Sequence, residues 1–593
     1  MTDSIDRSAD LSQPLDKLGP DERMKYQSDY LRGSIDRGLL DRITGSVAGD
    51  DIKLMKFHGI YQQDDRDIRD ERRRQKLEPA YSFMVRVRMP GGVCTSAQWL
   101  KLDELARAQG GDTIRLTTRQ TIQFHWVLKE EIRPAIQGLH EVLLDTIAAC
   151  GDDSRGVMST SYPGDSALDA QVAALARQLS DHVIPRTRAY HEIWYGEDRV
   201  AMSEPQEPFY GPTYMPRKFK IGFVIPPSND IDVYTQDLGF IAITGPDGLE
   251  GFNVAIGGGM GRTDGKPETY PRLADVIGYI DASRLVAATD AVMSVQRDYG
   301  NRVHRPRARF KYTIDDKGLD FVKAEIEARM GAALEPARPF AFTSNGDRLG
   351  WHEKDNGLLD YGLFVANGRI ANRDGVRLMD ALRAVAQTHE GGLRLTPNQN
   401  LIVADVPPAR RAEIEAILAA HGVEAEGRSA LRLNSIACVA LPTCALAMAE
   451  AERYLPDLIT RIEAILAGHN LLDEPITIRM SGCPNGCSRP YAAEIALTGR
   501  APGKYNLYVG GGFHGERLNR LVRENIGEAA ILETLGGMFA RYAAERGDGE
   551  HFGDFVLRAG YLDAERPALE DLRTDNMISS NSGSRLIGVI QKS

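Results

Sequence analysis

The sequence predicts an α+β fold of mixed α/β elements, in which a duplicated unit with pseudo-twofold symmetry forms three domains around a central site. Length is the first reason, because the chain has 593 residues and a single hydrophobic core stops growing at about 250–300 residues. Short segments also recur in the same order in the two halves of the chain. Finally, alternating segments typical of strands lie among amphipathic segments typical of helices.

The prediction of a duplication rests on segments that recur in the sequence. The matches pair residues 114–121 with 393–400, 253–259 with 506–512 and, more faintly, 158–163 with 480–484. Matches that keep one order indicate two copies of one unit. Ser161 stands in the first copy where Cys483 stands in the second. A centre that depends on Cys483 is therefore expected in one half only.

Both copies contain a run of three glycines, at residues 257–259 and 510–512. Residues 257–261 offer a partial dinucleotide-binding pattern, but the acidic residue and the βαβ frame that belong to that pattern are missing. We expect instead that the backbone approaches a large cofactor closely at these turns.

Composition restricts the function classes. Apolar residues make up 42% and charged residues 26% of the chain, as in ordinary globular proteins. The net charge of −11 argues against general binding to nucleic acid or anionic membranes. No window approaches the roughly 18 apolar residues of a membrane-spanning helix. Residues 1–17 are polar and lack the apolar stretch of a signal peptide, so a cytoplasmic location is expected.

Taken in order, the elements begin with a loose, polar segment over residues 1–20. Apolar spacing, alternation and glycine stops then predict helices over 21–32, 166–184, 411–421 and 445–468, the last interrupted by Pro456, and strands over 82–92 and 221–225. A dense charge run from Asp64 to Lys76 is either a solvated face or part of a docking segment.

Residues 115–125 are the most informative strand candidate. If this segment is extended, one face carries only polar and basic side chains, at positions 115, 117, 119, 121, 123 and 125, and the other face is apolar. An exposed face usually mixes acids with bases, whereas this one has arginines, hydroxyls, an amide and an imidazole. The pattern favours a partner that carries several negative charges.

Three further cations stand in comparable settings. Arg155 lies in a polar loop, residues 151–156, just before a predicted helix. Lys218 and Lys220 share one face of an extended segment and precede the apolar run 221–225. Two close lysines are usually solvated, but the buried strand that follows makes a half-buried cationic pair plausible.

Four of the six cysteines lie in two short motifs, Cys438-x5-Cys444 and Cys483-x3-Cys487. Four thiolates in a reducing compartment usually bind a metal. Structural zinc sites prefer ligand pairs two to four residues apart, and the first pair is wider. An iron–sulfur cluster accepts more varied spacings, and Gly482 and Gly486 permit close N–H contacts to its sulfurs. Cys94 and Cys150 have no cysteine nearby in the sequence and are interpreted as ordinary thiols.

The chain resembles the assimilatory sulfite and nitrite reductases that contain sirohaem and an iron–sulfur cluster. The resemblance rests on Cys438-x5-Cys444 with Cys483-Pro-Asn-Gly-Cys487, and it extends to residues 57–69, 86–92, 116–125 and 216–220. It runs from about residue 20 to about residue 570 and is strongest to the haemoprotein (beta) subunit of the bacterial NADPH-dependent enzymes.

The resemblance implies an oxidoreductase of sulfur assimilation and cysteine biosynthesis, which reduces sulfite to sulfide with six electrons. It implies a [4Fe–4S] cluster on Cys438, Cys444, Cys483 and Cys487, the last of which also joins the cluster to the haem iron of sirohaem. The implied catalytic residues are Arg86, Arg155, Lys218 and Lys220. The implied cofactor-binding residues are Arg115, Thr117, Arg119, Gln123, His125 and Asn485.

Domain boundaries follow from the repeats and the resemblance together. We expect an N-terminal arm over 1–80 that is partly disordered, a ferredoxin-like repeat domain over 81–147 and 350–425, a sirohaem and substrate-binding domain over 148–349, a cluster-binding and sirohaem-binding domain over 426–570, and a loose tail over 571–593. The family often has asparagines around its loop arginine, whereas this chain has Ser154 and Gly156, which have no side-chain amide to make the corresponding contacts.

No flavin or NADPH motif is present, so the resemblance implies a separate flavoprotein (alpha) subunit that supplies electrons from NADPH, with residues 1–80 as the candidate docking segment. A sirohaem nitrite reductase that forms ammonia is the nearest alternative, since it uses the same cofactors. A protein of another class, a non-enzymatic metal-binding scaffold or sensor with the same four cysteines, is the second alternative. The basic faces argue against a scaffold, because a scaffold needs no anion pocket.

Overall fold

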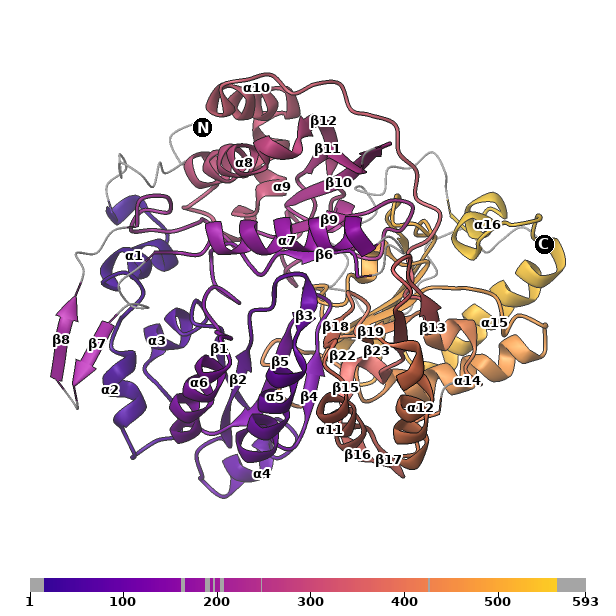
Figure 1. The fold of residues 1–593 in the computed structure, drawn as a ribbon, viewed down its shortest axis with the longest axis horizontal. Helices are drawn as coiled ribbons and strands as arrows, with labels where there is room; N and C mark the ends of the chain where they lie inside the picture. Colours follow the sequence, from indigo (N-terminus) through magenta and orange to yellow (C-terminus); the bar gives the residue numbers. More distant parts are fainter. Residues whose placement is uncertain are drawn as a thin grey trace.

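The computed structural model describes residues 15–161, 166–186, 192–195, 198–202, 207–246, 248–424 and 427–562. Figure 1 shows four five-stranded sheets with helices around them, and elements from both halves of the chain meet at the centre. None of the helices among the described residues combines the length and apolarity that crossing a bilayer requires. The predicted loose segment covers residues 1–20, of which residues 1–14 lie outside the described residues. For residues 15–20 the prediction is wrong, because Leu15–Lys17 forms a 3-10 helix and a helix begins at Pro20. The predicted loose tail, 571–593, lies outside the described residues.

The first sheet has the order β1-β2-β5-β4-β15. Its strands are β1 (Ile60–Asp64), β2 (Tyr81–Arg86), β5 (Ile122–Val127), β4 (Ile114–Leu116) and β15 (Arg369–Ile370), and its helices are α5 (Ser96–Gln109) and α6 (Ile132–Glu141). Thr95 begins α5 with a capping box, because its side chain accepts from the N–H of Gln98 and the Gln98 side chain accepts from the N–H of Thr95.

The second sheet has the order β13-β14-β19-β18-β3. Its strands are β13 (Gly350–Glu353), β14 (Leu359–Leu363), β19 (Leu401–Val406), β18 (Leu393–Leu395) and β3 (Val93–Cys94), and its helices are α11 (Leu378–Thr388) and α12 (Arg411–Ala420). Each sheet takes one edge strand from the other segment of the chain, β15 in the first and β3 in the second. The two sheets are therefore built together.

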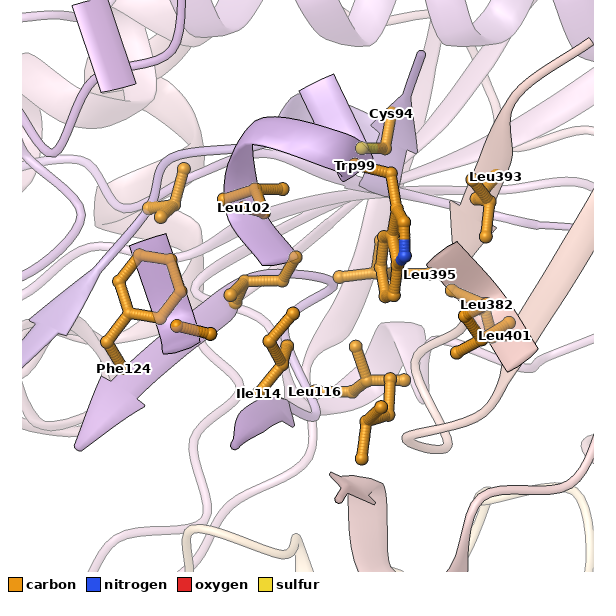
Figure 2. Close-up of a cluster of buried hydrophobic side chains, with 14 of the residues drawn as sticks. Cys94, Trp99, Leu102, Ile114, Leu116, Phe124, Leu382, Leu393, Leu395 and Leu401 are labelled. Carbon is orange, nitrogen blue, oxygen red and sulfur yellow. The ribbon is translucent and has the colours of Figure 1, made fainter. Parts of the chain in front are cut away.

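One hydrophobic core joins these two sheets. Figure 2 shows Trp99 and Leu102 of α5 beside Leu382 of α11 and Leu395 of β18. All four side chains are at most 1% exposed. Fully burying such a side chain stabilises a fold by about 1.5–3 kcal/mol, so the two halves hold each other in place.

The third and fourth sheets share one strand pattern. The third contains β12 (Asp275–Asp281), β11 (Gly248–Ile256), β10 (Leu238–Gly245), β9 (Ile221–Val224) and β6 (Met158–Ser159), and the fourth contains β24 (Arg520–Ile526), β23 (Lys504–Val509), β22 (Ile495–Ala501), β21 (Ile478–Ser481) and β20 (Ser435–Ala437). In both, three strands at one edge are parallel and the other two pairings are antiparallel.

The remaining elements surround these sheets. Beside the third sheet lie α7 (Ser166–His182), α8 (Leu285–Tyr299), α9 (Phe310–Lys317) and α10 (Leu319–Met330); beside the fourth lie α13 (Ala430–Leu433), α14 (Leu455–Ala467), α15 (Glu528–Glu545) and α16 (Phe552–Arg558). The N-terminal segment forms α1 (Pro20–Gln27), α2 (Ile35–Leu40), α3 (Gly49–Leu54) and α4 (Arg69–Arg74). Two small ribbons pair β7 (Glu192–Tyr195) with β8 (Asp198–Met202) and β16 (Asn372–Arg373) with β17 (Val376–Arg377).

Much of the N-terminal segment is packed into the body. Leu31, Leu54 and Phe57 are buried in the hydrophobic cluster of the third sheet, and Val47 and Ile60 are buried in that of the first two sheets. The short helix α4, in contrast, contains no buried residue among its six.

Several predicted elements are confirmed. The helices predicted over 166–184 and 411–421 are α7 and α12, and the strand predicted over 221–225 is β9. The helix predicted over 21–32 ends earlier, at Gln27, because turns lead from there to Gly33. The helix predicted over 445–468 begins only at Leu455, because Pro456 occupies the first turn, where a missing N–H costs nothing.

The faint third repeat is wrong. Met158 lies on β6, whose counterpart in the fourth sheet is β20, whereas Met480 lies on β21, the counterpart of β9. Ser161 is therefore not the counterpart of Cys483. A resemblance over so few residues cannot determine which of two neighbouring parallel strands it belongs to.

The glycines of the two triple-glycine turns also permit close packing within the protein itself. A Cβ on Gly258 would lie 2.2 Å from the carbonyl oxygen of Tyr234, and one on Gly511 would lie 2.2 Å from that of Ala493. These glycines let the protein's own backbone pass closely, which any other residue would prevent.

Candidate functional site

The two cysteine motifs meet because two parallel strands end at the same edge of the fourth sheet. β20 leads directly into Cys438, and β21 leads into Cys483 two residues after its end. The strands are in register from Ser435 to Ala437, and the N–H of Cys438 donates to the carbonyl of Met480 at 3.1 Å. The two cysteine motifs, which are far apart in the sequence, therefore lie close together in space.

All four thiols influence one another. Burial raises the pKa of Cys438 well above its usual value, and Cys487, Cys483 and Cys444 raise it further. Burial likewise raises the pKa of Cys483 to about 12. Neighbouring thiolates of this kind need a positive partner, and a bound metal centre deprotonates them outright.

The surroundings fit an iron–sulfur cluster better than a single zinc ion. The N–H of Gly482 donates to the Cys438 sulfur at 3.2 Å, and the Asn485 amide donates to the Cys483 sulfur at 3.5 Å. Within the described ranges, no three metal-binding side chains lie close enough together to hold one ion. Cysteine sulfurs that accept hydrogen bonds from backbone and side-chain N–H groups are typical of an iron–sulfur cluster.

Residues from distant segments hold the cysteine loops. Arg66 Nη1 donates to the carbonyls of Cys444 at 3.0 Å and Ala447 at 2.5 Å. The hydroxyl of Thr118 donates to the carbonyl of Cys487 at 2.9 Å. Cys487 itself is exposed, whereas Ser488 and the two residues after it are buried. Cys487 is thus the most exposed of the four cysteines.

Residues 115–125 form a hairpin, so the prediction of one continuous strand is wrong. β4 and β5 pair antiparallel across a tight turn, which Thr117 N–H to Thr121 O closes at 3.0 Å and in which Gln120 adopts a left-handed φ of 53°. The turn is favoured because the hydroxyls of Thr117 and Thr121 also bond each other at 2.7 Å.

The predicted polar face exists nevertheless, because the pairing restores it. Arg86 on β2 lies opposite Gln123 on β5, Gln123 lies opposite Arg115 on β4, and Arg115 lies opposite Arg369 on β15. Residues opposite each other in antiparallel strands share a face. A row of three arginines and one amide thus crosses the first sheet, with His125 two residues along the same face.

Parts of this face have no partner among the described residues. The Nε atoms of Arg86 and Arg119 and the Nε2 atom of His125 are buried without a hydrogen bond. His125 Nδ1 contacts Gln63 Oε1 at 3.3 Å, which leaves its other nitrogen for a ligand. Buried polar groups are nearly always paired, so these atoms fit the carboxylates of a sirohaem.

Arg115 differs from the other predicted cofactor residues. Its guanidinium contacts the Glu452 carboxylate and donates to the carbonyls of Ala437 at 2.8 Å and Asn367 at 2.6 Å. These partners use most of its hydrogen-bonding capacity, since a guanidinium has five N–H groups. Arg115 therefore faces the cysteine loop through protein contacts.

The four predicted catalytic residues converge. The backbone N–H of Arg155 donates to Phe219 O at 2.9 Å, which sets it beside Lys218 and Lys220. Its side chain donates to Gly151 O at 2.9 Å. Arg86 Nη1 donates to the sulfur of the neighbouring Cys150 at 3.1 Å. Arg119 lies between the two groups, with bonds to Gly156 O at 2.7 Å and Ile221 O at 3.3 Å.

Electrostatics support the same convergence. Burial lowers the pKa of Lys218 to about 7, and the cations Arg217, Arg309 and Arg155 lower it further, while Cys487 raises it. Burial and then Arg119 and Lys218 hold the pKa of Lys220 well below its usual value. The clustered cations, which we call the basic pocket and which comprise Arg86, Arg119, Arg155, Lys218 and Lys220, thus carry more positive charge than the few nearby carboxylates compensate. The adjacent residues Thr118 and Arg119 connect this cluster to Cys487.

The sequence analysis missed two cations of this pocket, Arg309 and Lys311. Arg309 pairs with the buried Asp237 at 2.8 Å, and Lys311 donates to the carbonyls of Gly259 at 3.0 Å and Gly261 at 2.9 Å. A signal was present, because Arg309-Phe310-Lys311 repeats the pattern Lys218-Phe219-Lys220. The two phenylalanine rings pack together with centroids 5.7 Å apart.

The sequence analysis also missed one hydroxyl group and one thiol group of this cluster. Tyr61 and Cys150 lie between Arg86 and Arg155, and burial together with the neighbouring Cys150 raises the pKa of Tyr61 to about 12. Although burial opposes it, Tyr61 and Cys150 hold the pKa of Arg155 above its usual value. Cys150, interpreted from sequence as an ordinary thiol, is therefore part of the basic pocket.

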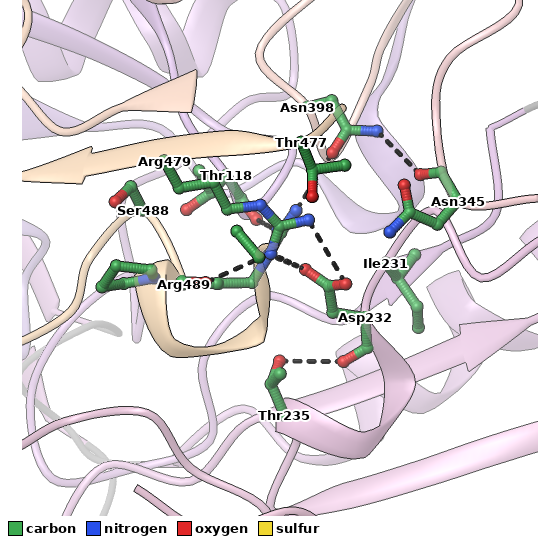
Figure 3. A network of polar contacts seen from close by, with 12 residues as sticks. Thr118, Ile231, Asp232, Thr235, Asn345, Asn398, Thr477, Arg479, Ser488 and Arg489 are labelled. Carbon is green, nitrogen blue, oxygen red and sulfur yellow. Dashed lines mark hydrogen bonds and ion pairs between the residues drawn. The ribbon is translucent and has the colours of Figure 1, made fainter. Parts of the chain in front are cut away.

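A buried ion-pair network connects the third and fourth sheets behind the cysteines (Figure 3). Asp232 accepts from Arg479 and from Arg489 at 2.5 Å each, and its side chain is 1% exposed. Arg489 also donates to Thr118 O at 2.8 Å and to Asn398 Oδ1 at 3.2 Å. One carboxylate thus joins both halves of the protein beside the cysteine motif.

Comparison with known proteins gives consistent results. Two family models match: the nitrite/sulfite reductase ferredoxin-like half domain over residues 74–142 and 352–421, and the nitrite and sulphite reductase 4Fe-4S domain over residues 175–334. The structure of the Mycobacterium tuberculosis NirA protein has a TM-score of 0.76 at 24% identity, and the alignment covers 95% of this chain and 99% of that one. The predicted mixed α/β fold with duplicated ferredoxin-like halves is confirmed.

Curated relatives are much closer in sequence. The sulfite reductase [NADPH] hemoprotein beta-component of Nitrosomonas europaea is 68% identical, with 94% of this chain and 97% of the relative covered. That of Methylocella silvestris is 65% identical, with 95% and 98% covered. The similarity thus spans nearly the whole of all three chains. The chain belongs to the family of sulfite reductase hemoprotein beta-components.

Proposed function

We propose that this chain is the catalytic subunit of an NADPH-dependent sulfite reductase, which reduces sulfite to sulfide with six electrons, and that the four predicted cysteines and four predicted cations carry the reaction. One observation supports this most directly. The hydroxyl of Thr118 donates to the carbonyl of Cys487 at 2.9 Å, and the next residue, Arg119, donates to the carbonyls of Gly156 and Ile221. The basic pocket therefore lies next to the exposed cysteine. A small oxyanion held there is beside the metal centre.

The cations have two tasks. Sulfite is a dianion at high pH and loses three oxygens as water during its reduction, so each departing oxygen needs stabilisation and protons. Arg86 and Arg155 supply permanent positive charge for binding. Lys218, whose pKa burial and nearby cations lower to about 7, supplies a proton near neutral pH. A catalytic acid works best when its pKa is near the working pH.

The two cofactors supply single electrons to the bound sulfur when they are present. Cys438, Cys444, Cys483 and Cys487 would hold the [4Fe–4S] cluster, with Asn485 and Gly482 donating to its cysteine sulfurs. Cys487, the exposed cysteine, would link the cluster to the sirohaem. Arg119, His125 and Gln123 would face the sirohaem carboxylates, and Thr117 would order the turn between them.

Sulfite is favoured over nitrite because the relatives from Nitrosomonas europaea and Methylocella silvestris are named as sulfite reductases. The basic pocket itself suits either anion. A scaffold or sensor built on the same cysteines would leave the convergent cations without a task. The ratio of kcat/KM for sulfite to kcat/KM for nitrite tests the first distinction, and a ratio below one would make nitrite the substrate.

The electron donor is proposed to be a flavoprotein (alpha) subunit, because the relatives are beta-components of an NADPH-dependent enzyme. Residues 1–80 remain our candidate docking segment. Two contacts support this: Arg66 binds the Cys444 loop, and Asp67 pairs with Arg453 at 2.6 Å. The exposed helix α4 follows these contacts directly. A donor bound there is next to a cluster ligand.

The absorption spectrum of the purified protein tests the proposal, with spectra recorded before and after dithionite and sulfite. We expect a red-region band of a sirohaem that shifts when sulfite is added. A colourless protein that contains zinc would overturn both the ligand assignment and the mechanism. A brown protein without the macrocycle band would support the proposed cluster ligands and contradict the proposed sirohaem contacts.

A further inference from the structure

Glu452 is a largely buried carboxylate that closes the first cysteine loop. Its side chain is 10% exposed. Its backbone N–H donates to the carbonyl of Cys438 at 3.1 Å, and its own carbonyl accepts from the Asn367 amide at 2.9 Å. The segment between Cys438 and Glu452 is thus a closed loop, and Asn367, from the edge of the first sheet, holds it from outside.

Two arginines bind this carboxylate. Arg369 Nε donates to Glu452 Oε1 at 2.7 Å and Arg369 Nη2 donates to Oε2 at 3.0 Å, which is the bidentate geometry of a strong pair. Arg115 contacts Oε2 and donates to the carbonyl of Ala437, the residue before Cys438. Both arginines come from adjacent strands of the first sheet, β4 and β15.

The three charges do not cancel. Two guanidinium groups face one carboxylate, which leaves one positive charge in a buried region beside the cysteines. The Arg115 guanidinium lies directly at this position, since it donates at 2.8 Å to the carbonyl of Ala437, the residue before Cys438. Charges act strongly at short range where water is excluded. The reduction potential of an iron–sulfur cluster depends on nearby charge and on hydrogen bonds to its ligands.

We infer that Glu452, Arg115 and Arg369 form a positioning triad that fixes the Cys438 loop and sets the reduction potential of the cluster. The inference rests on the proposed function, in which Cys438 and its three partners bind the cluster. None of the three residues touches the substrate. They act through the loop and through their field, and they let the ferredoxin-like sheet influence a centre that lies in another domain.

The test is a redox titration of the loaded protein, with the cluster followed by EPR spectroscopy. Glu452→Gln removes a negative charge and keeps hydrogen-bonding atoms, so the midpoint potential should shift to a more positive value. Arg369→Gln removes a positive charge, so the potential should shift to a more negative value. Glu463→Gln is the matched control, because Glu463 on α14 forms an ion pair with Arg432 on α13. The cluster of this control variant should have the same midpoint potential as that of the unchanged protein.

Opposite shifts in the two variants support the triad. Shifts in the same direction, or potentials equal to that of the control, overturn the triad. This holds even if both variants unfold at a lower temperature, because residues that only stabilise the loop would lower the unfolding temperature without opposite shifts in potential. If Glu452→Gln does not assemble a cluster, Arg369→Gln decides alone: a negative shift supports the triad, and any other result overturns it. Absence of a [4Fe–4S] signal in the unchanged protein would instead overturn the proposed ligands.

Discussion

The third and fourth sheets use one backbone frame for two different purposes. Ile221 and Ile478 begin equivalent strands, and each pairs with the first residue of the next strand, Leu238 and Ile495. Counting from these starts, Asp230 is the counterpart of Cys487. The bond from Thr160 N–H to Phe223 O, 3.0 Å, repeats the bond from Cys438 N–H to Met480 O.

Thr160 is therefore the counterpart of Cys438, and the two halves differ at the positions that matter for a metal. In the third sheet the Thr160 hydroxyl bonds Asp230 Oδ1 at 3.0 Å, and Ser161 N–H bonds Oδ2 at 3.0 Å. A hydrogen bond thus closes one site on itself, whereas thiols at the equivalent positions of the other site remain available. The frame positions the residues, and the side chains alone decide whether a metal centre forms.

The same comparison explains the junction between the halves. Asp232 and Arg489 are counterparts, and both adopt left-handed backbone conformations, with φ of 49° and 55°. Opposite charges at counterpart positions meet across the pseudo-twofold relation and form the buried ion pair of Figure 3. Identical residues there would repel or leave a buried charge unpaired.

The largest expected effect comes from making the fourth sheet resemble the third. The double substitution Cys438→Thr and Cys487→Asp should abolish cluster binding and sulfite reduction, because two of the four proposed thiolate ligands become hard oxygen groups. Iron and acid-labile sulfide analysis, with the visible spectrum, measures the loss. Cys94→Ala is the control and should keep its full cluster content. A double variant that retains the cluster would show that other residues are the ligands.

Removing a cation from the basic pocket should have the next largest effect. Lys218→Met should lower kcat/KM for sulfite by about 10²–10⁴-fold, the usual contribution of a positioned acid, while the cluster and the sirohaem spectrum persist. Lys354→Met, at an ion pair with Asp405 in the second sheet, should change kcat/KM less than twofold. Equal activities of the two variants would remove Lys218 from the mechanism.

Breaking the junction between the halves should cost stability. Asp232→Asn leaves two buried arginines without their carboxylate, and uncompensated buried charges of this kind cost about 3–5 kcal/mol. Thermal unfolding of the loaded protein measures the loss. Asp264→Asn, at a partly exposed pair with Arg500, should cost at most about 1 kcal/mol. If both substitutions lowered the stability by a similar, small amount, the Asp232 ion pairs would not be what holds the two halves together.

The pH dependence should follow from Lys218, whose pKa is lowered to about 7 by burial and nearby cations. Its protonated fraction falls as the pH rises through this value, so kcat/KM for sulfite should fall about tenfold per pH unit above it if that proton is required. A profile over pH 6–9, with an artificial one-electron donor, measures the decline. In Lys218→Met this alkaline decline should be absent, and its persistence there would assign the proton to another group.

The sequence was sufficient where spacing directly reports geometry. The four cysteines, α7 and the repeat of residues 114–121 in 393–400 were all recognisable, and both copies of that repeat do form the same turn, with Gln120 and Gln399 at φ of 53° and 69°. The sequence predictions failed where contacts between distant segments or the pairing of strands decide the structure. Residues 115–125 alternate as one strand would, and only the turn at Thr117 shows that they fold back. Glu452 could not be recognised, because its partners Arg115 and Arg369 are distant in the sequence.

The smallest expected effect tests whether the closed site of the third sheet is held by its hydrogen bond. Thr160→Val keeps the shape of the side chain but removes the hydroxyl that bonds Asp230, whose pKa burial raises to about 6. The loss should be about 1 kcal/mol, more if Asp230 remains charged without this donor. Because the site holds no metal ligand, cluster content and kcat should stay unchanged while the unfolding temperature falls. A change in cluster content would mean that the two sites communicate, and that the frame they share transmits more than position.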